Sequence, residues 1–217
     1  MFIQKASKDS PPMFENKFID LFSRTHFLTV AIVYVPASLA LLYYSWVSLG
    51  VSWWLTLALA AVGFVAWTLL EYWLHRTLFH WIPTARWGPR FHFFLHGVHH
   101  DWPNDKYRLV MPPAVSGALF FLFLGLSLLV FGTTYGWAFH AGLTIGYMNY
   151  DLTHYYLHHG KAKKGRMRRL RQHHIIHHFK KGHTGKFGVS TTVWDRVFRT
   201  LESRPVEPKE AKPAPQS

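Results

Sequence analysis

Four short clusters contain eleven of the 16 histidines in this 217-residue sequence. A neutral imidazole is a common metal ligand, so histidines at such short spacings are typical of a metal site. Residues three or four positions apart share one face of a helix, which lets the rings of each cluster converge. The clusters consist of His75 and His80; of His96, His99 and His100; of His154, His158 and His159; and of His174, His177 and His178.

The number of clustered histidines predicts two metal ions. A single octahedral ion takes about six ligands at most, whereas two ions with four or five histidines each take about eight to ten. We leave His159 out of the ligand set, because it lies off the helix face that His154 and His158 share. His75 and His80 are five residues apart and converge only where the helix end is distorted. The predicted ligands are His75, His80, His96, His99, His100, His154, His158, His174, His177 and His178.

Two carboxylates and one further histidine are expected next to these ligands without binding metal themselves. Glu71 precedes His75 by four residues, and Asp151 precedes His154 by three. Carboxylates at such positions commonly accept the second N–H of a metal-bound imidazole and thereby orient its ring. We expect that role for Glu71 and Asp151, and we place His159 beside the site.

The composition excludes several other metal chemistries. The chain contains no cysteine, which rules out a thiolate zinc site, a cysteine-ligated iron–sulfur cluster and a cysteine nucleophile. A haem held by two histidines needs rings well inside the helices, and only His140 lies well inside an apolar segment. We therefore expect no haem. Imidazole binds Fe, Zn, Cu and Ni, so the ligand types leave iron and zinc open.

Long apolar segments must position these residues. Between residues 28 and 74 the only charged side chain is Glu71, and between residues 109 and 159 it is Asp151. A helix needs roughly 20 apolar residues to cross the hydrocarbon core of a bilayer. We predict an all-α integral membrane protein with four transmembrane helices in two hairpins. The spans are expected at about 28–49, 51–73, 114–131 and 136–157.

The distribution of basic residues favours a membrane over a nucleic acid as the partner. The formal net charge is +13, yet Lys and Arg lie only outside the apolar segments, and 15 of the 24 follow residue 160. The positive-inside rule places both termini and the middle segment in the cytosol. We divide the chain into a cytosolic lead (1–27), a four-span domain (28–202) and a disordered tail (203–217). Within the four-span domain, residues 75–112 and 158–202 are expected to form a cytosolic helical cap that holds the di-metal site.

At these clusters the sequence resembles the membrane fatty acid hydroxylase superfamily, the histidine-box di-iron enzymes that include the sterol desaturases. The residues between the clusters narrow the resemblance to the fatty acid 2-hydroxylase branch. The most specific string is Asp-Lys-Tyr-Arg-Leu-Val-Met-Pro-Pro, which ends at Pro113. The resemblance covers roughly residues 60–200 and is carried by Glu71–His80, His96–Pro113, Tyr150–His159, His177–Phe179, Phe187–Ser190 and Trp194–Phe198.

The resemblance implies two non-haem irons that use O₂ and two electrons to hydroxylate C2 of a fatty acyl chain. The chain would be a free fatty acid or part of a sphingolipid such as ceramide, and no catalytic residue is implied beyond the metal site. Zinc could replace iron in a purified sample, because imidazole accepts both. Lys106, Tyr107 and Arg108 precede the third span, where they would either hold the polar head of the substrate or anchor the protein at the interface.

The expected partners are a lipid acyl substrate, the bilayer and an electron donor. Members of this branch often carry an N-terminal cytochrome b5 domain, and 27 residues before the first span are too few to form one. We therefore expect a separate donor, such as a cytochrome b5-like or ferredoxin-type protein. The basic residues after residue 160 could dock this donor or bind anionic lipid headgroups. His173, beside His174, could compete with it as a ligand.

The expected location is a multi-pass position in a membrane, with a bacterial inner membrane favoured over the endoplasmic reticulum.

The histidine clusters alone leave open a sterol, carotenoid or alkane oxidase or desaturase of the same superfamily. A metal transporter should hold ligands near the middle of the bilayer, whereas spans 28–49 and 114–131 contain neither charge nor histidine. A metal-dependent lipid hydrolase needs only about three histidines and a carboxylate per ion, so most of the clustered histidines would be redundant in such an enzyme.

Overall fold

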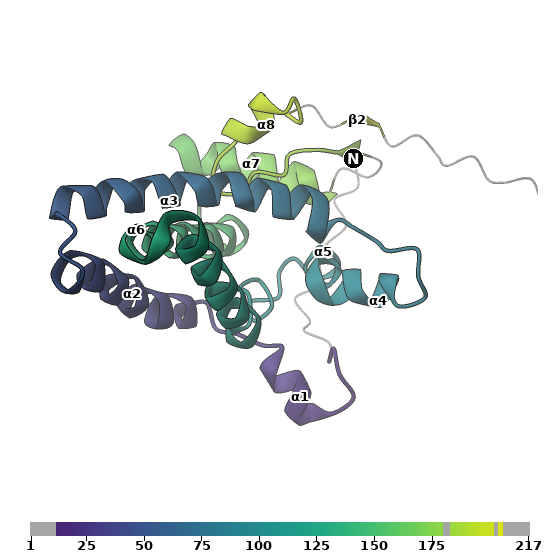
Figure 1. Ribbon diagram of the computed structural model, residues 1–217. Coiled ribbons are helices and arrows are strands. Elements are labelled where there is room, and N and C mark those ends of the chain that lie inside the picture. Colours follow the sequence, from purple (N-terminus) through teal and green to yellow (C-terminus); the bar gives the residue numbers. More distant parts are fainter. Residues whose placement is uncertain (1–11, 180–182, 202–203, 206–217) are drawn as a thin grey trace, which may run out of the picture.

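The computed structural model describes residues 12–179, 183–201 and 204–205 (Figure 1). Helices dominate this part of the chain, and three π-helical segments interrupt or extend them: η1 (Tyr44–Ser48), η2 (Leu74–Phe79) and η3 (Phe93–Gly97). The α-helices are α1 (Lys17–Phe22), α2 (Leu28–Tyr43), α3 (Trp53–Trp73), α4 (Gly88–His92), α5 (Val98–Asp101), α6 (Pro113–His159), α7 (Gly165–Phe179) and α8 (Val193–Val197).

One short antiparallel pair joins β1 (His183–Thr184) to β2 (Arg204–Pro205). The strand β2 falls inside the tail that we expected to be disordered. The other residues of that tail, 203 and 206–217, lie outside the described part of the chain, as do residues 1–11 of the predicted lead. Residues 17–22 of the lead form α1, whose first N–H groups are capped by the Asn16 side chain.

Within the described residues, three helices are long and apolar enough, by length and composition, to cross a membrane. They are Leu28–Ser48 (α2 with η1), Trp53–Phe79 (α3 with η2) and Pro113–His159 (α6). Many of their apolar side chains point away from the protein, and Leu129 is 81% exposed. A surface of this kind is stable in contact with lipid rather than with water. These three helices are therefore candidates for membrane spans.

The third apolar helix bends sharply at Gly132, whose backbone is non-helical (φ 70°, ψ 170°). The rings of Phe120 and His140 nevertheless lie 4.6 Å apart, centroid to centroid. Twenty residues of straight helix would separate them by about 30 Å. The chain after Gly132 therefore runs back along the part before it. The third and fourth spans that we predicted are two parts of the single element α6.

The helix α6 lies between α2 and α3 and packs against both (Figure 1). The backbones of α3 and α6 approach closely, because a Cβ atom at Gly142 would lie 1.9 Å from the carbonyl oxygen of Ala60. Small residues allow such contacts between membrane helices. Trp67, Tyr147 and Leu143 fill the core beside this contact. This packing holds the C-terminal ends of α3 and α6 at the same end of the bundle.

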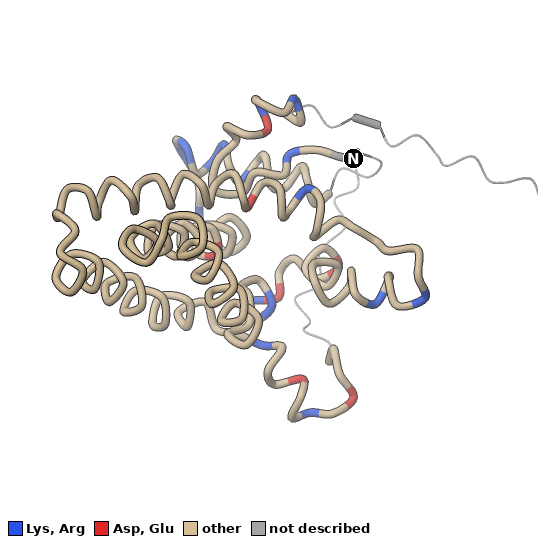
Figure 2. Tube along the Cα trace, viewed as in Figure 1, with Lys and Arg blue, Asp and Glu red and all other residues tan. Residues whose placement is uncertain are grey.

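Charged residues gather at that same end. Figure 2 shows α2 and most of α3 free of Lys, Arg, Asp and Glu, whereas charged residues lie on α1, α4, α7 and α8. The segment α8 packs against the C-terminal half of α3, where the Trp194 indole N–H donates to the Thr68 hydroxyl at 2.9 Å. The polar segments thus form a cap over one end of the apolar helices.

Candidate metal centre

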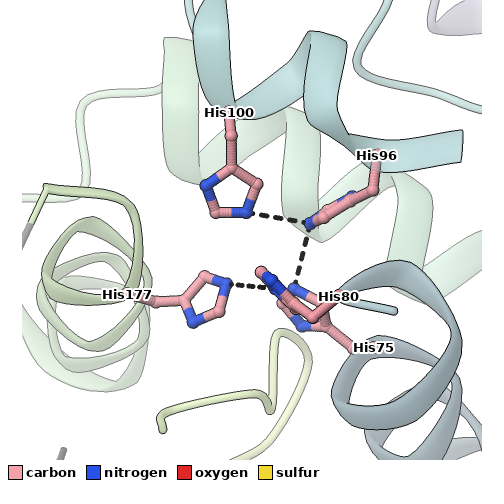
Figure 3. A group of neighbouring side chains, drawn as sticks. All are labelled: His75, His80, His96, His100 and His177. Carbon is pink, nitrogen blue, oxygen red and sulfur yellow. Dashed lines mark hydrogen bonds between the residues drawn. The ribbon is translucent and has the colours of Figure 1, made fainter. Parts of the chain in front are cut away.

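The ten predicted ligands lie together in the cap, in two groups of five. Within each group one ring nitrogen from every histidine lies within 4.8 Å of all the others. We call them the His75 group, drawn in Figure 3, and the His99 group. The His75 group consists of His75, His80, His96, His100 and His177, and the His99 group consists of His99, His154, His158, His174 and His178.

A π-helix brings the first cluster together. His75 lies in η2 and His80 directly follows it, and their ring centroids are 5.0 Å apart. In a π-helix the hydrogen bonds join residues five apart, so this spacing places both rings on one side. The distorted helix end that the five-residue spacing required is thus a π-helical turn. His96 comes from a second π-helix, η3, and His177 from α7.

Ordinary helical turns build most of the His99 group. His154 and His158 are one turn apart on α6, and His174 and His178 are one turn apart on α7. His99 on α5 completes the group, and its ring centroid lies 4.5 Å from that of His154. The ends of α6 and α7 and the short helix α5 therefore meet at this position.

The spacing of the ring nitrogens fits one metal ion in each group. In the His75 group the Nε2 atom of His96 lies 3.1 Å from Nε2 of His75 and 3.1 Å from Nε2 of His100. In the His99 group His174 Nε2 lies 2.8–3.0 Å from three other Nε2 atoms. A neutral ring has only one N–H and cannot satisfy three such neighbours by hydrogen bonds. Each of these nitrogens could instead direct a lone pair at one metal ion, with metal–nitrogen bonds of about 2.0–2.1 Å.

Burial keeps these rings uncharged. Removal from water, followed by repulsion from neighbouring histidines, lowers the pKa of His80 to about 3 and that of His100 to about 2. The same causes act on the fully buried rings of the cap. Metal ions bind the neutral form, so protons do not compete for these nitrogens at neutral pH. The pKa lies well below its usual value for His96, His99, His174 and His178.

Backbone carbonyls orient two rings of the His75 group. His75 Nδ1 lies 2.5 Å from the carbonyl oxygen of Phe187, and His177 Nδ1 lies 2.9 Å from that of Gly185. An Nδ1–H that donates to a carbonyl leaves Nε2 with a free lone pair for a metal. The segment that supplies both carbonyls therefore sets the direction of two predicted ligands.

The carboxylates that we expected in this role bind elsewhere. Glu71 accepts hydrogen bonds from the Ser190 N–H at 2.9 Å and from the Ser190 hydroxyl at 2.7 Å. Asp151 Oδ2 accepts from the Met111 N–H at 3.3 Å. Residues 185–190 pack against the end of α3 through the bond between Ser190 and Glu71. Their backbone carbonyls, rather than the predicted carboxylates, lie within hydrogen-bond distance of two rings. His159 belongs to neither group and packs on the ring of Tyr155.

One residue of this network was not singled out from the sequence. Asp195 accepts hydrogen bonds from the N–H groups of Phe187 and Gly188, at 2.9 and 2.8 Å. It also accepts from the Thr200 hydroxyl at 2.7 Å and from His173, the histidine that we considered as a competing ligand, at 3.0 Å. The sequence marks Asp195 only as part of the stretch Trp194–Phe198, which is one of the segments that carry the family resemblance.

A largely apolar cleft of about 420 Å³ reaches both histidine groups. Its wall includes His96 of the His75 group and His99 of the His99 group. Apolar side chains from α1, α4 and the start of α6 line the rest, among them Phe22, Phe91 and Val115. The cleft can hold an apolar chain with one end beside the ring nitrogens.

The three residues proposed for a substrate head group lie in different surroundings. Arg108 lines the cleft, and its guanidinium pairs with Asp20 at 3.1 Å and with Asp105 at 3.5 Å. Lys106 and Tyr107 are exposed and do not line this cleft. The structure thus places Arg108 alone of the three at the cleft.

Comparison with known proteins gives one consistent family. The model of the fatty acid hydroxylase family matches residues 60–200. The chain is 36% identical to the dihydroceramide fatty acyl 2-hydroxylase FAH2 of Arabidopsis thaliana, covering 89% of this chain and 81% of that protein. It is 39% identical to the ceramide very long chain fatty acid hydroxylase SCS7 of Saccharomyces cerevisiae, covering 89% of this chain and 50% of that protein. A solved structure of full-length scs7p, with only the hydroxylase domain visible, superposes with a TM-score of 0.80 at 35% identity, covering 86% of this chain and 70% of that chain.

Proposed function

This chain belongs to the fatty acid hydroxylase family, and from that premise we propose that it hydroxylates C2 of a fatty acyl chain in a membrane. It is a hydroxylating oxidoreductase of the fatty acid 2-hydroxylase type. The observation that carries the proposal is the apolar cleft whose wall includes His96 of the His75 group and His99 and His154 of the His99 group.

The metal ions that we propose are two irons, one in each histidine group. Bound there, they would supply the activation of O₂, with two electrons and two protons consumed for each hydroxyl group and water formed. The ten histidines would hold the ions through Nε2, and the carbonyls of Gly185 and Phe187 would hold two of the rings in place. The apolar cleft walls would exclude water and align the acyl chain. Zinc remains an alternative occupant in a purified sample.

In the membrane, we propose that the two parts of α6 cross separately, which gives four spans in two hairpins. The reversal at Gly132 and the contact between Phe120 and His140 support this arrangement. The position of Lys and Arg at one end of the bundle supports a cytosolic cap and cytosolic termini. The relatives named above come from a plant and a yeast, so they lend no support to a bacterial inner membrane.

The charges in the cleft favour an acyl chain with an uncharged head. Arg108 is the only Lys or Arg among the described residues that line the cleft, and two carboxylates already compensate its charge. A free carboxylate entering the cleft would lose hydration without gaining a side-chain counter-ion. We therefore favour an amide-linked acyl chain, as in ceramide, over a free fatty acid. Lys106 and Tyr107 are exposed, and we propose that they contact lipid headgroups.

The electrons would come from a separate donor protein, cytochrome b5-like or ferredoxin-type. The exposed arginines Arg166, Arg168 and Arg169 on α7 support an acidic partner. A donor that binds there should deliver electrons more slowly as the salt concentration rises.

The test is expression of the chain in a host with a reducing system, beside a His177→Ala control. Total lipid is saponified, and the fatty acids are searched by mass spectrometry for one added oxygen, located by fragmentation. Oxygen at C2 that depends on His177 is the expected result. Oxygen at another position, or on a sterol, carotenoid or alkane, would leave the family intact and refute the C2 assignment.

A further inference from the structure

We propose that Asp195 makes the two histidine groups unequal as metal sites, with the His75 group binding more tightly because Asp195 fixes the segment that orients two of its rings. The inference rests on the proposed metal function. It assigns Asp195 a positioning role, since the residue contacts neither the cleft nor any of the ten predicted ligands by a hydrogen bond described above.

Asp195 is completely buried, and both of its oxygens are occupied. Oδ1 accepts from the Phe187 N–H at 2.9 Å and from the Thr200 hydroxyl at 2.7 Å. Oδ2 accepts from the Gly188 N–H at 2.8 Å and from His173 Nε2 at 3.0 Å. Four donors around one carboxylate form a strong and directional set of hydrogen bonds. The backbone at residues 187 and 188 therefore has one defined position.

The position of this backbone segment brings two carbonyl groups next to the Nδ1 atoms of His75 and His177. The Phe187 carbonyl lies 2.5 Å from His75 Nδ1, one peptide unit from the N–H that Asp195 holds. The Gly185 carbonyl lies 2.9 Å from His177 Nδ1. Between them Lys186 adopts φ 63°, an uncommon backbone conformation that its surroundings must maintain. Its N–H donates to the carbonyl of Thr200, whose side chain Asp195 also holds.

The His99 group has no comparable support. The Nδ1 atoms of four of its five histidines are buried and lack a hydrogen-bond partner among the described residues. Ring partners of this kind typically change metal affinity about 10–100-fold. The four histidines are His99, His154, His174 and His178.

Other contacts hold the same segment on α3 independently of Asp195. Glu71 binds Ser190 through its N–H and hydroxyl, and the Trp194 indole N–H donates to Thr68. Asp195→Asn is therefore expected to loosen residues 185–188 without releasing the segment. The amide NH₂ of asparagine cannot accept hydrogen bonds, so one of the two backbone N–H groups, that of Phe187 or that of Gly188, loses its acceptor.

The experiment measures each metal site alone in the purified, metal-free full chain. His158→Ala leaves only the His75 group complete, and His80→Ala leaves only the His99 group complete. Zn²⁺ is titrated in competition with a fluorescent chelator. We expect the His158→Ala protein to bind its Zn²⁺ at least about tenfold more tightly than the His80→Ala protein. Adding Asp195→Asn should weaken the first about 10–100-fold and the second less than about threefold.

Trp194→Phe is the matched control, because it removes the bond to Thr68 and keeps every contact of Asp195. It should leave both affinities within about threefold of their starting values. Equal weakening of both sites by Asp195→Asn would show a general structural role and overturn the inference, as would no weakening at all. An unmodified chain that binds no Zn²⁺ at either group would instead refute the proposed metal function, and this inference with it.

Discussion

His99 and His100 are consecutive residues on α5, yet their rings belong to different histidine groups. His99 Nε2 lies 2.9 Å from His178 Nε2, whereas His100 Nε2 lies 3.1 Å from His96 Nε2. The helix α5 therefore stands between the two groups and contributes one ring to each. The same division separates His177 from His178 on α7. Two neighbouring metal positions that share their supporting helices would follow from this arrangement.

Single alanine substitutions at His177 and His178 should each remove one metal ion. His177 belongs to the His75 group and His178 to the His99 group, so each change leaves the other group complete. Metal analysis of the purified protein should fall from about two ions per chain to about one in either variant. His159→Ala is the control, because His159 lies outside both groups. Loss of both ions from either single variant would contradict two independent sites.

Gly132→Ala should destabilise the protein, because Gly132 has φ 70° and ψ 170°, a backbone conformation that costs a residue with a side chain roughly 1–3 kcal/mol. Gly125→Ala is the matched control in the same element. A Cβ atom at either glycine has nothing within 4 Å, and only Gly132 has a positive φ. The midpoint of thermal unfolding in detergent should fall for Gly132→Ala and should not fall for Gly125→Ala. Equal midpoints would show that the reversal at Gly132 is not required by the fold.

The stability of the metal-free protein should decrease as the pH falls below about 6.5. The pKa of His80 is about 3 and that of His100 about 2 in the folded chain, well below the unfolded value of about 6.5. Between these limits the unfolded chain binds protons that the folded chain excludes, so acid favours unfolding. Each such histidine contributes a slope of up to about 1.4 kcal/mol per pH unit.

Thermal unfolding in detergent between pH 7.5 and 5.5 measures this slope. The midpoint should fall with pH, and His100→Gln should make the fall shallower, because one of the excluded protons is then absent. A midpoint that rises as the pH is lowered would contradict the burial of neutral rings.

Filling the cleft should block hydroxylation and leave metal binding unchanged. Val115 lines the cleft near the start of α6, and Val115→Trp would occupy part of its volume of about 420 Å³. The yield of 2-hydroxy fatty acid should fall at least about tenfold, since the acyl chain must align with the metal site. Val130→Trp, on the exposed surface of the same helix, is the control. A normal product yield from Val115→Trp would exclude this cleft as the substrate path.

Arg108→Gln should destabilise the protein even without substrate. The Arg108 side chain is 2% exposed, and its removal leaves Asp105 without the ion pair at 3.5 Å and Asp20 without the one at 3.1 Å. Removal of one partner from a buried ion pair typically costs about 3–5 kcal/mol. Lys106→Gln, at an exposed neighbour, should change the free energy of unfolding by less than about 0.5 kcal/mol. Chemical denaturation in detergent compares the two, and equal stability would contradict a structural role for Arg108.

The sequence alone predicted ten histidines that the structure brings together, and the apolar segments that form its three candidate membrane helices. Helical spacing determines which residues share a face, so His154 with His158 and His174 with His178 could be paired directly. Apolar segments long enough for a membrane span could be recognised because the thickness of the bilayer sets the length of such a helix. The expected boundary between the spans 114–131 and 136–157 includes Gly132, where the backbone of α6 is non-helical.

Only the tertiary structure decided how these residues are grouped and supported. Local periodicity does not specify that His99 and His100 serve different groups, because that depends on helices distant in sequence. The five-residue spacing of His75 and His80 indicated a distorted helix end but did not specify a π-helical turn. The ring partners are backbone carbonyls, which every residue carries, so no side-chain pattern marks Gly185 or Phe187 for this role. Asp195, in a segment that follows the last cluster, accepts hydrogen bonds from the N–H groups of Phe187 and Gly188 beside these carbonyls.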